Sequence, residues 1–156
     1  MQRQSPSNSS PPEPIYFVDR DLGAHQFPSI LGAAGLHVRR HVDHFAPQAP
    51  DDVWLPAVGS QGWIALTHDR NMSRDSLLVA ACMRAGVRLF VIRGKAPTAE
   101  LAKNFVVVEH RVRLLVARHP GPFIAKVFQA KDGTNKSLRE AVEMYLTQAE
   151  WTAKYR

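Results

Sequence analysis

The sequence contains a single cysteine among its 156 residues, Cys82. One cysteine cannot form an intramolecular disulfide, and this scarcity fits a protein of the reducing cytoplasm. Cys82 lies in the apolar, helix-like run 77–83, where a cysteine usually fills core space and does not act as a nucleophile. We therefore interpret Cys82 as a core residue and expect a cytoplasmic protein.

No apolar run reaches membrane-spanning length, so we expect no association with a membrane. The first 14 residues are polar and rich in proline, and they lack the apolar stretch that a secretory signal requires. We interpret residues 1–14 as a disordered tail. A GxGxxG phosphate loop is also missing, because Gly32 and Gly35 fall in a predicted helix and at its end.

A zinc site is not favoured, although His41-x-x-His44 has a spacing that places two histidines on one helix face. The segment 37–42 resembles a strand, on which these two side chains would not meet. Cysteine ligands and an HExxH motif are absent as well. We interpret these histidines as polar loop residues.

Strand-like apolar segments alternate with helix-like segments along the chain. We expect strands at residues 15–19, 37–42, 63–66, 87–92 and 123–128, the last at an edge of the sheet, and helices at 27–34, 51–61, 75–85, 97–119 and 138–149. Asp51 follows a proline-rich segment and is expected to cap its helix, and Ser137-x-x-Glu140 has the form of a capping box. This alternation predicts an α/β fold with a mostly parallel sheet covered on both faces.

The formal charge of +6 is unevenly distributed. Residues 1–60 hold four arginines and six acidic residues, whereas the remaining chain holds sixteen lysines and arginines and eight acidic residues. Acidic groups beside a basic surface are what a metal-dependent enzyme acting on a polyanion requires. A basic surface that only keeps a small domain soluble is the alternative, and charge alone does not separate the two.

Three aspartates, Asp19, Asp51 and Asp69, stand where a predicted strand ends or a helix begins. The carboxyl ends of parallel strands border one crevice, and several carboxylates in one crevice repel each other unless a hard cation lies between them. Mg²⁺ or Mn²⁺ is the expected ion, and such ions suit phosphate chemistry.

Each acidic position also has a simpler explanation. Asp21, two residues after Asp19, is either a second ligand or a residue that caps the following turn. Asp51 and Asp52 open a helix, where capping alone would explain one of them. Thr67-x-Asp69 is the most specific element, because a hydroxyl two residues before a carboxylate can bind a phosphate or orient a metal-bound water.

The segments FVDRDLG, PDDVWLP, GWIALTHDR and GPFIAKVF, in this order and spacing, resemble the PIN-like domains related to VapC-type toxin nucleases, over residues 15–128. The resemblance implies a three-layer α/β/α sandwich whose acidic residues bind Mg²⁺ or Mn²⁺ and cleave single-stranded RNA. Asp19 matches the first-strand acid, Asp51 or Asp52 the mid-domain acid, and Asp69 and Thr67 the T-x-D strand end. Many relatives carry a further acid after that aspartate, where this chain has Arg70-Asn71-Met72.

The leading hypothesis from sequence is therefore a metal-dependent endoribonuclease. The domain spans 15–128, and 129–156 form a C-terminal helical extension. The cation is held by Asp19, Asp51 and Asp69, with Asp52 and Asp21 as further candidates, and Thr67 positions the water. Flanking phosphates are bound by Arg70, Arg74, Arg93 and Lys95, and His68 is a bystander or a substrate contact. The resemblance adds a cognate antitoxin and a homodimer as partners.

Two rival functions follow from the same residues. Asp19-Arg20-Asp21 after an apolar strand resembles the D-x-D motif of haloacid-dehalogenase-like phosphatases, although Gly23 and the later chain depart from their pattern. A PIN-like module that binds RNA or protein without catalysis is the second rival.

Overall fold

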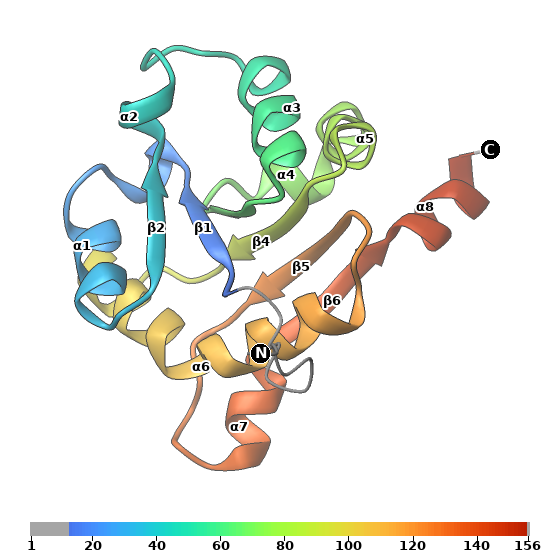
Figure 1. Cartoon of the computed structure of the whole chain (residues 1–156). Coiled ribbons are helices and arrows are strands. Elements are labelled where there is room, and N and C mark those ends of the chain that lie inside the picture. Colours follow the sequence, from blue (N-terminus) through green and yellow to red (C-terminus); the bar gives the residue numbers. More distant parts are fainter. Residues whose placement is uncertain (1–12, 156) are drawn as a thin grey trace, which may run out of the picture.

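The computed structural model describes residues 13–155, which form one six-stranded sheet with helices on both faces (Figure 1). The strands are β1 (Ile15–Val18), β2 (His37–Arg40), β3 (Ile64–Thr67), β4 (Arg88–Ile92), β5 (Phe123–Val127) and β6 (Val142–Thr147). Their order across the sheet is β2-β1-β3-β4-β5-β6. The first five strands are parallel, and β6 runs antiparallel to β5. The predicted α/β/α sandwich is confirmed.

Alternating side chains of the buried strands build two separate cores. Tyr16 and Val18 of β1 face α1 (Gln26–Ala33) and α6 (Thr98–Arg118), whereas Phe17 faces α3 (Asp51–Gln61) and α5 (Ser76–Ala85). A strand that is covered on both faces shows a continuous apolar run, which is what β1, β3 and β4 have. Cys82 is fully buried in the α3–α5 core, as predicted.

A short helix replaces the second half of the predicted strand 37–42. Strand β2 ends at Arg40, and residues His41–His44 form α2. Arg40 favours this turn, because its guanidinium binds the carboxylate of Asp43 three residues later through two 2.8 Å hydrogen bonds. The prediction of a strand through Val42 was wrong.

The prediction of a wholly helical extension over residues 129–156 was also wrong. Helix α7 (Asn135–Glu140) is followed by strand β6 and then by α8 (Gln148–Tyr155). Along β6 half-buried residues alternate with exposed ones over Val142–Tyr145, which is the period of a strand. Strand β5 is therefore internal and not an edge strand, and α8 reaches away from the sheet (Figure 1).

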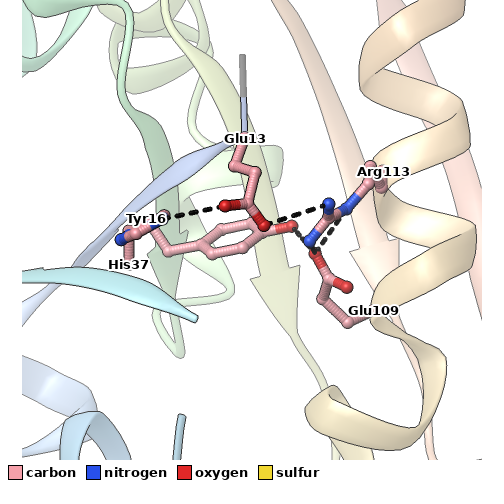
Figure 2. A network of polar contacts seen from close by, with 5 residues as sticks. All are labelled: Glu13, Tyr16, His37, Glu109 and Arg113. Carbon is pink, nitrogen blue, oxygen red and sulfur yellow. Dashed lines mark hydrogen bonds and ion pairs between the residues drawn. The ribbon is translucent and has the colours of Figure 1, made fainter. Parts of the chain in front are cut away.

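A polar network fastens α6 to the beginning of β1, at the edge of the sheet opposite the carboxyl ends of the strands. The Tyr16 hydroxyl donates to Glu109 Oε2 at 2.6 Å, and Arg113 donates to the same oxygen at 2.9 Å (Figure 2). Glu13 joins this network through Arg113 and His37. Residues 1–12 of the predicted tail lie outside the described residues, whereas Glu13 takes part in these contacts.

Candidate active site

The acidic residues gather at the point where the strand order reverses. Strand β1 is followed along the chain by β2 on one side of it, and β3 lies on its other side. In open α/β sheets this switch point opens a crevice at the carboxyl ends of the strands. Asp19 directly follows β1 and is tied to β3 by a 2.9 Å bond from its backbone N–H to the Leu66 carbonyl.

Thr67, the last residue of β3, joins two carboxylates through one hydroxyl group. Its Oγ1 lies 2.9 Å from Asp19 Oδ2 and 3.2 Å from Asp21 Oδ2. A hydroxyl has a single proton to donate, and the shorter contact assigns it to Asp19. The same oxygen accepts the backbone N–H of Asp69 at 3.1 Å. Thr67 therefore orders three of the predicted site residues.

Asp21 is bound to the end of β3 by more hydrogen bonds than the sequence suggested. It belongs to the 3₁₀ turn η2 (Arg20–Leu22), and its carboxylate accepts the backbone N–H of His68 at 3.1 Å. Asp69 forms a local turn instead, because its Oδ1 accepts the backbone N–H of Asn71 at 2.9 Å.

Asp51 does not cap its helix as predicted. Pro50 occupies the capping position, and Asp51 Oδ1 accepts the indole N–H of Trp54 at 2.8 Å. Asp52 is exposed. Within residues 13–155 no group of three or more His, Cys, Asp or Glu side chains is arranged to hold one metal ion. The structure thus pairs Asp19 with Asp21 and leaves Asp51, Asp52 and Asp69 outside a common set of ligands.

The carboxylates nevertheless influence one another electrostatically. Burial raises the pKa of Asp19 to about 7, and the negative charges of Asp21 and Asp51 contribute to this shift. The pKa of Asp21 is also raised, by burial and by the charge of Asp69. No ion pair among the described residues includes Asp19 or Asp21. The buried carboxylate of Asp19 and the exposed carboxylate of Asp21 are a donor set that fits a hard divalent cation.

A basic cavity adjoins the acidic crevice. It measures about 500 Å³ and is lined by His68, Arg70, Arg93 and Lys95, together with Ile92, Gly94 and Phe128. His68 links the two regions, because its backbone binds Asp21 and its ring Nε2 lies 3.0 Å from the Gly94 carbonyl oxygen. Three of the four predicted phosphate-binding residues therefore line one cavity.

Lys126 and Phe128 are part of this region and were not predicted. Burial lowers the pKa of Lys126, and the positive charges of Arg93 and Arg74 lower it further. Arg74 therefore acts electrostatically on the same region. The guanidinium of Arg93 lies 5.7 Å from the centre of the Phe128 ring. Lys126 and Phe128 lie at the end of β5. An apolar strand pattern does not reveal which polar side chains surround the end of the strand.

The histidine pair at His41 and His44 does lie on a helix, contrary to prediction. His41 is buried and packs against Phe17 and Phe45, whereas His44 is exposed and lies edge-on to Trp63. Within residues 13–155 neither histidine belongs to a group of three or more side chains that could hold a metal ion.

Comparison with known proteins identifies the family. A PIN-like domain profile matches residues 14–94, which is more than half of the chain and includes all five predicted acidic residues. The chain belongs to the PIN-like domain family. The resemblance stated from sequence is confirmed.

One relative of this PIN-like protein is a Mycobacterium tuberculosis protein named "Putative ribonuclease VapC45". The two are 32% identical over 123 residues, which cover 74% of this chain and 86% of the relative. No solved structure matches the chain. Among the helices of residues 13–155, none is both long enough and apolar enough to cross a membrane.

Proposed function

We propose that this PIN-like protein is a metal-dependent endoribonuclease that cleaves single-stranded RNA. The observation that supports it most is the arrangement of Asp19, Thr67 and Asp21 at the switch point of the sheet, in which Asp19 and Thr67 are buried and Asp21 is exposed. A basic cavity with Arg70, Arg93 and Lys95 lies beside it. Carboxylates for a cation and cations for a phosphate chain are the two parts that phosphodiester hydrolysis needs.

Asp19 and Asp21 would hold Mg²⁺ or Mn²⁺, with Asp51 and Asp69 adding negative charge nearby. A bound divalent cation supplies Lewis acidity toward the scissile phosphate. Thr67 keeps the two carboxylates in place, because its hydroxyl donates to Asp19 and lies within reach of Asp21. We therefore assign Thr67 to orienting the carboxylates and not to positioning water. Arg70, Arg93 and Lys95 would bind the phosphates that flank the cleaved bond.

The relative's name also supports a place in a toxin–antitoxin pair. In this proposal a small antitoxin covers the acidic crevice and the protein works in the cytoplasm, as a monomer or a homodimer. Coexpression with the product of a neighbouring small gene, followed by copurification and loss of cleavage, would test the partner.

The central experiment measures cleavage of a 5′-labelled single-stranded RNA with Mg²⁺, with Mn²⁺ and with EDTA. We expect Asp19→Asn and Asp21→Asn to lower the cleavage rate by about 100-fold or more, because each removes a charged ligand of the cation. Glu140→Gln is the matched control, since Glu140 is exposed on α7 and this variant should cleave at the wild-type rate. Wild-type rates in both aspartate variants would refute the assignment.

A non-catalytic RNA-binding module is the second candidate function. Two observations favour it: Arg70-Asn71-Met72 follow Asp69 where relatives carry an acid, and no group of three metal-binding side chains forms among residues 13–155. It predicts RNA binding that persists in EDTA and in Asp19→Asn, with no cleavage by the wild type. Membership of the PIN-like family leaves the phosphatase alternative without support.

A further inference from the structure

One face of the sheet continues from Thr67 in the acidic site to an exposed tyrosine on β6. Ala65 of β3 and Ile124 of β5 belong to the core under α3 and α5. Side chains alternate along a strand, so Thr67 and Lys126, each two residues further on, project from this same face. The Nζ atom of Lys126 lies 4.0 Å from the centre of the Tyr145 ring, which is 43% exposed. Thr67, Lys126 and Tyr145 therefore share one face of the sheet.

The register of the strands gives the distance between these residues. Thr67 pairs with Val91 of β4, and Val91 pairs with Lys126 of β5. Neighbouring strands are about 4.8 Å apart, so the backbone of Lys126 is about 10 Å from that of Thr67. Tyr145 lies one strand further, where the pairing of β6 with β5 shifts, and such an irregularity can re-aim a side chain. An extended strand that leaves the acidic site across β4 would pass over Lys126 and Tyr145.

The charge along this face suits a phosphate chain. Lys126 is only partly buried, and the positive charges of Arg93 and Arg74 act on it. The charge of Glu143, its cross-strand partner, opposes them. No ion pair among residues 13–155 includes Lys126, Arg74 or Arg93. Three positive groups and one negative group leave an excess of positive charge, which favours a polyanion.

Tyr145 supplies the second component that a single-stranded nucleic acid requires. Every base has a flat face that can stack on an aromatic ring, while neighbouring cations bind the backbone of the strand. An exposed ring with an ammonium group beside it offers both contacts at one place. The excess of positive charge, and the continuity with the basic cavity through Arg93, favour RNA over a protein partner on this face.

We propose that Lys126 and Tyr145 form a second contact for single-stranded RNA, in which Lys126 binds a phosphate and a base away from the cleaved bond stacks on the Tyr145 ring. The inference rests on the proposed ribonuclease function and deepens it, because it assigns the course of the substrate across β4, β5 and β6. Only a strand long enough to reach from Thr67 to Tyr145 would use this Lys126–Tyr145 contact.

The first experiment measures the Kd of a single-stranded RNA of about ten nucleotides in the Asp19→Asn background, where the strand stays intact. We expect Tyr145→Ala to raise the Kd by about 10-fold without changing its salt dependence, because stacking involves no charge. Lys126→Gln should raise the Kd and also reduce the slope of log Kd against log salt by about 0.7, since one phosphate contact is lost. Tyr145→Phe, which keeps the ring, should restore most of the affinity.

Tyr155 and Lys154 are the matched control pair. Tyr155 is 53% exposed, and Lys154 Nζ lies 5.4 Å from the centre of its ring, on the helix α8 that reaches away from the sheet (Figure 1). Tyr155→Ala and Lys154→Gln should keep the Kd of the Asp19→Asn protein, and thermal unfolding checks that each variant is folded.

An unchanged Kd in both Tyr145→Ala and Lys126→Gln would overturn the proposal, and so would an equal rise in Tyr155→Ala. An unchanged Kd counts against the RNA contact even if Tyr145→Ala breaks a complex with the product of the neighbouring small gene. The tyrosine would in that case belong to a protein interface.

The second experiment follows the tyrosine rings by NMR and needs no substitution in the proposed contact. The chain contains three tyrosines, of which Tyr16 is fully buried and Tyr155 lies on α8. In Asp19→Asn protein with isotope-labelled tyrosine, the same RNA should shift the Tyr145 signal until saturation and leave the other two in place. A strand of equal length without bases should shift it far less. Equal shifts with both strands, or no shift of Tyr145 with RNA, would overturn base stacking at this residue.

The two proposals fail in different ways. If no RNA is cleaved with either metal while RNA still shifts Tyr145, the ribonuclease function falls and the Lys126–Tyr145 contact stands. If RNA is cleaved at a rate that depends on Asp19 while Tyr145 never responds, the contact falls and the nuclease stands.

Discussion

At the scale of single residues, the fold keeps Asp19 where its ionised form is unfavourable. The carboxylate is only 6% exposed, lies near Asp21 and Asp51, and has a hydroxyl and a backbone N–H as its hydrogen-bonding partners. These surroundings disfavour the charge more than the two hydrogen bonds favour it, which is why the pKa is raised to about 7. A site of this kind stores free energy that a bound cation can release.

We predict that the metal-free protein becomes less stable as the pH rises from about 4 to 7. In this window folded Asp19 still binds its proton while unfolded Asp19, with a pKa of 3.8, has lost it, so the free energy of unfolding falls with pH. A shift from 3.8 to about 7 corresponds to at most about 4 kcal/mol. Asp19→Asn should remove this loss and stabilise the protein at pH 8, as measured by urea unfolding in EDTA.

Asp132 supplies a control with the opposite sign. Hydrogen bonds from Thr134 lower the pKa of this exposed carboxylate, so its contribution to stability is present near neutral pH and lost on acidification. Asp132→Asn should therefore destabilise at pH 8, whereas Asp19→Asn stabilises. If Asp19→Asn leaves the pH dependence of the free energy of unfolding between pH 4 and 7 unchanged, the Asp19 carboxylate is not the cause of that dependence.

Sequence reasoning predicted that Asp19 and Thr67 lie at the carboxyl ends of strands, where the structure also has them, because both end strongly apolar runs. It underestimated Asp21, because the chain leaves β1 in a 3₁₀ turn and the carboxylate returns to the end of β3. The burial of His41 was not predicted for a similar reason: the sequence looks like a continuing strand, and only the Arg40–Asp43 contact shows that a helical turn begins there.

At the scale of elements, the helices and strands predicted correctly are those whose apolar pattern fits only one type of secondary structure. The apolar runs of β1, β3 and β4 and the regular period of α6 are of this kind. The segment after Glu140 has two interpretations, because Leu138, Val142 and Leu146 repeat at helical spacing while Val142, Met144 and Leu146 alternate as in a strand. Pairing with β5 decides for the strand, and that partner lies outside any local window.

Helices α3 and α5 approach each other closely at Gly59. A Cβ atom added there would lie 1.9 Å from the Ala85 carbonyl oxygen, which belongs to backbone and cannot move aside. We predict that Gly59→Ala lowers the free energy of unfolding by about 1–3 kcal/mol or more, because the two helices must separate. Urea unfolding measures this effect.

Gly32 in α1 is the matched control for Gly59. It is exposed and within a helix, and an added Cβ atom would meet nothing within 4 Å. Gly32→Ala should therefore stabilise by about 0.5–1 kcal/mol, since alanine is the better helix former. Destabilisation by both variants to the same extent would show that the close approach of α3 and α5 is not the cause.

At the scale of the whole molecule, three positively charged side chains lie together in the cavity that we propose as the RNA path. Arg70, Arg93 and Lys95 line the basic cavity at the carboxyl edge of the sheet. Helix α6 leads back from this edge, and its 21 residues carry the chain about 30 Å to Arg118. Charges at the two ends of α6 should therefore contribute unequally to RNA binding.

We predict that Arg93→Ala and Lys95→Ala weaken RNA binding and reduce its dependence on salt, whereas Arg118→Ala does neither. Binding of single-stranded RNA is measured in the Asp19→Asn background, where the RNA stays intact, at several salt concentrations. Each lost phosphate contact should reduce the slope of log Kd against log salt by about 0.7, because fewer counterions are released. Equal slope changes for all three variants would mean that net charge alone governs binding, and the basic cavity would then lose its assignment as the RNA path.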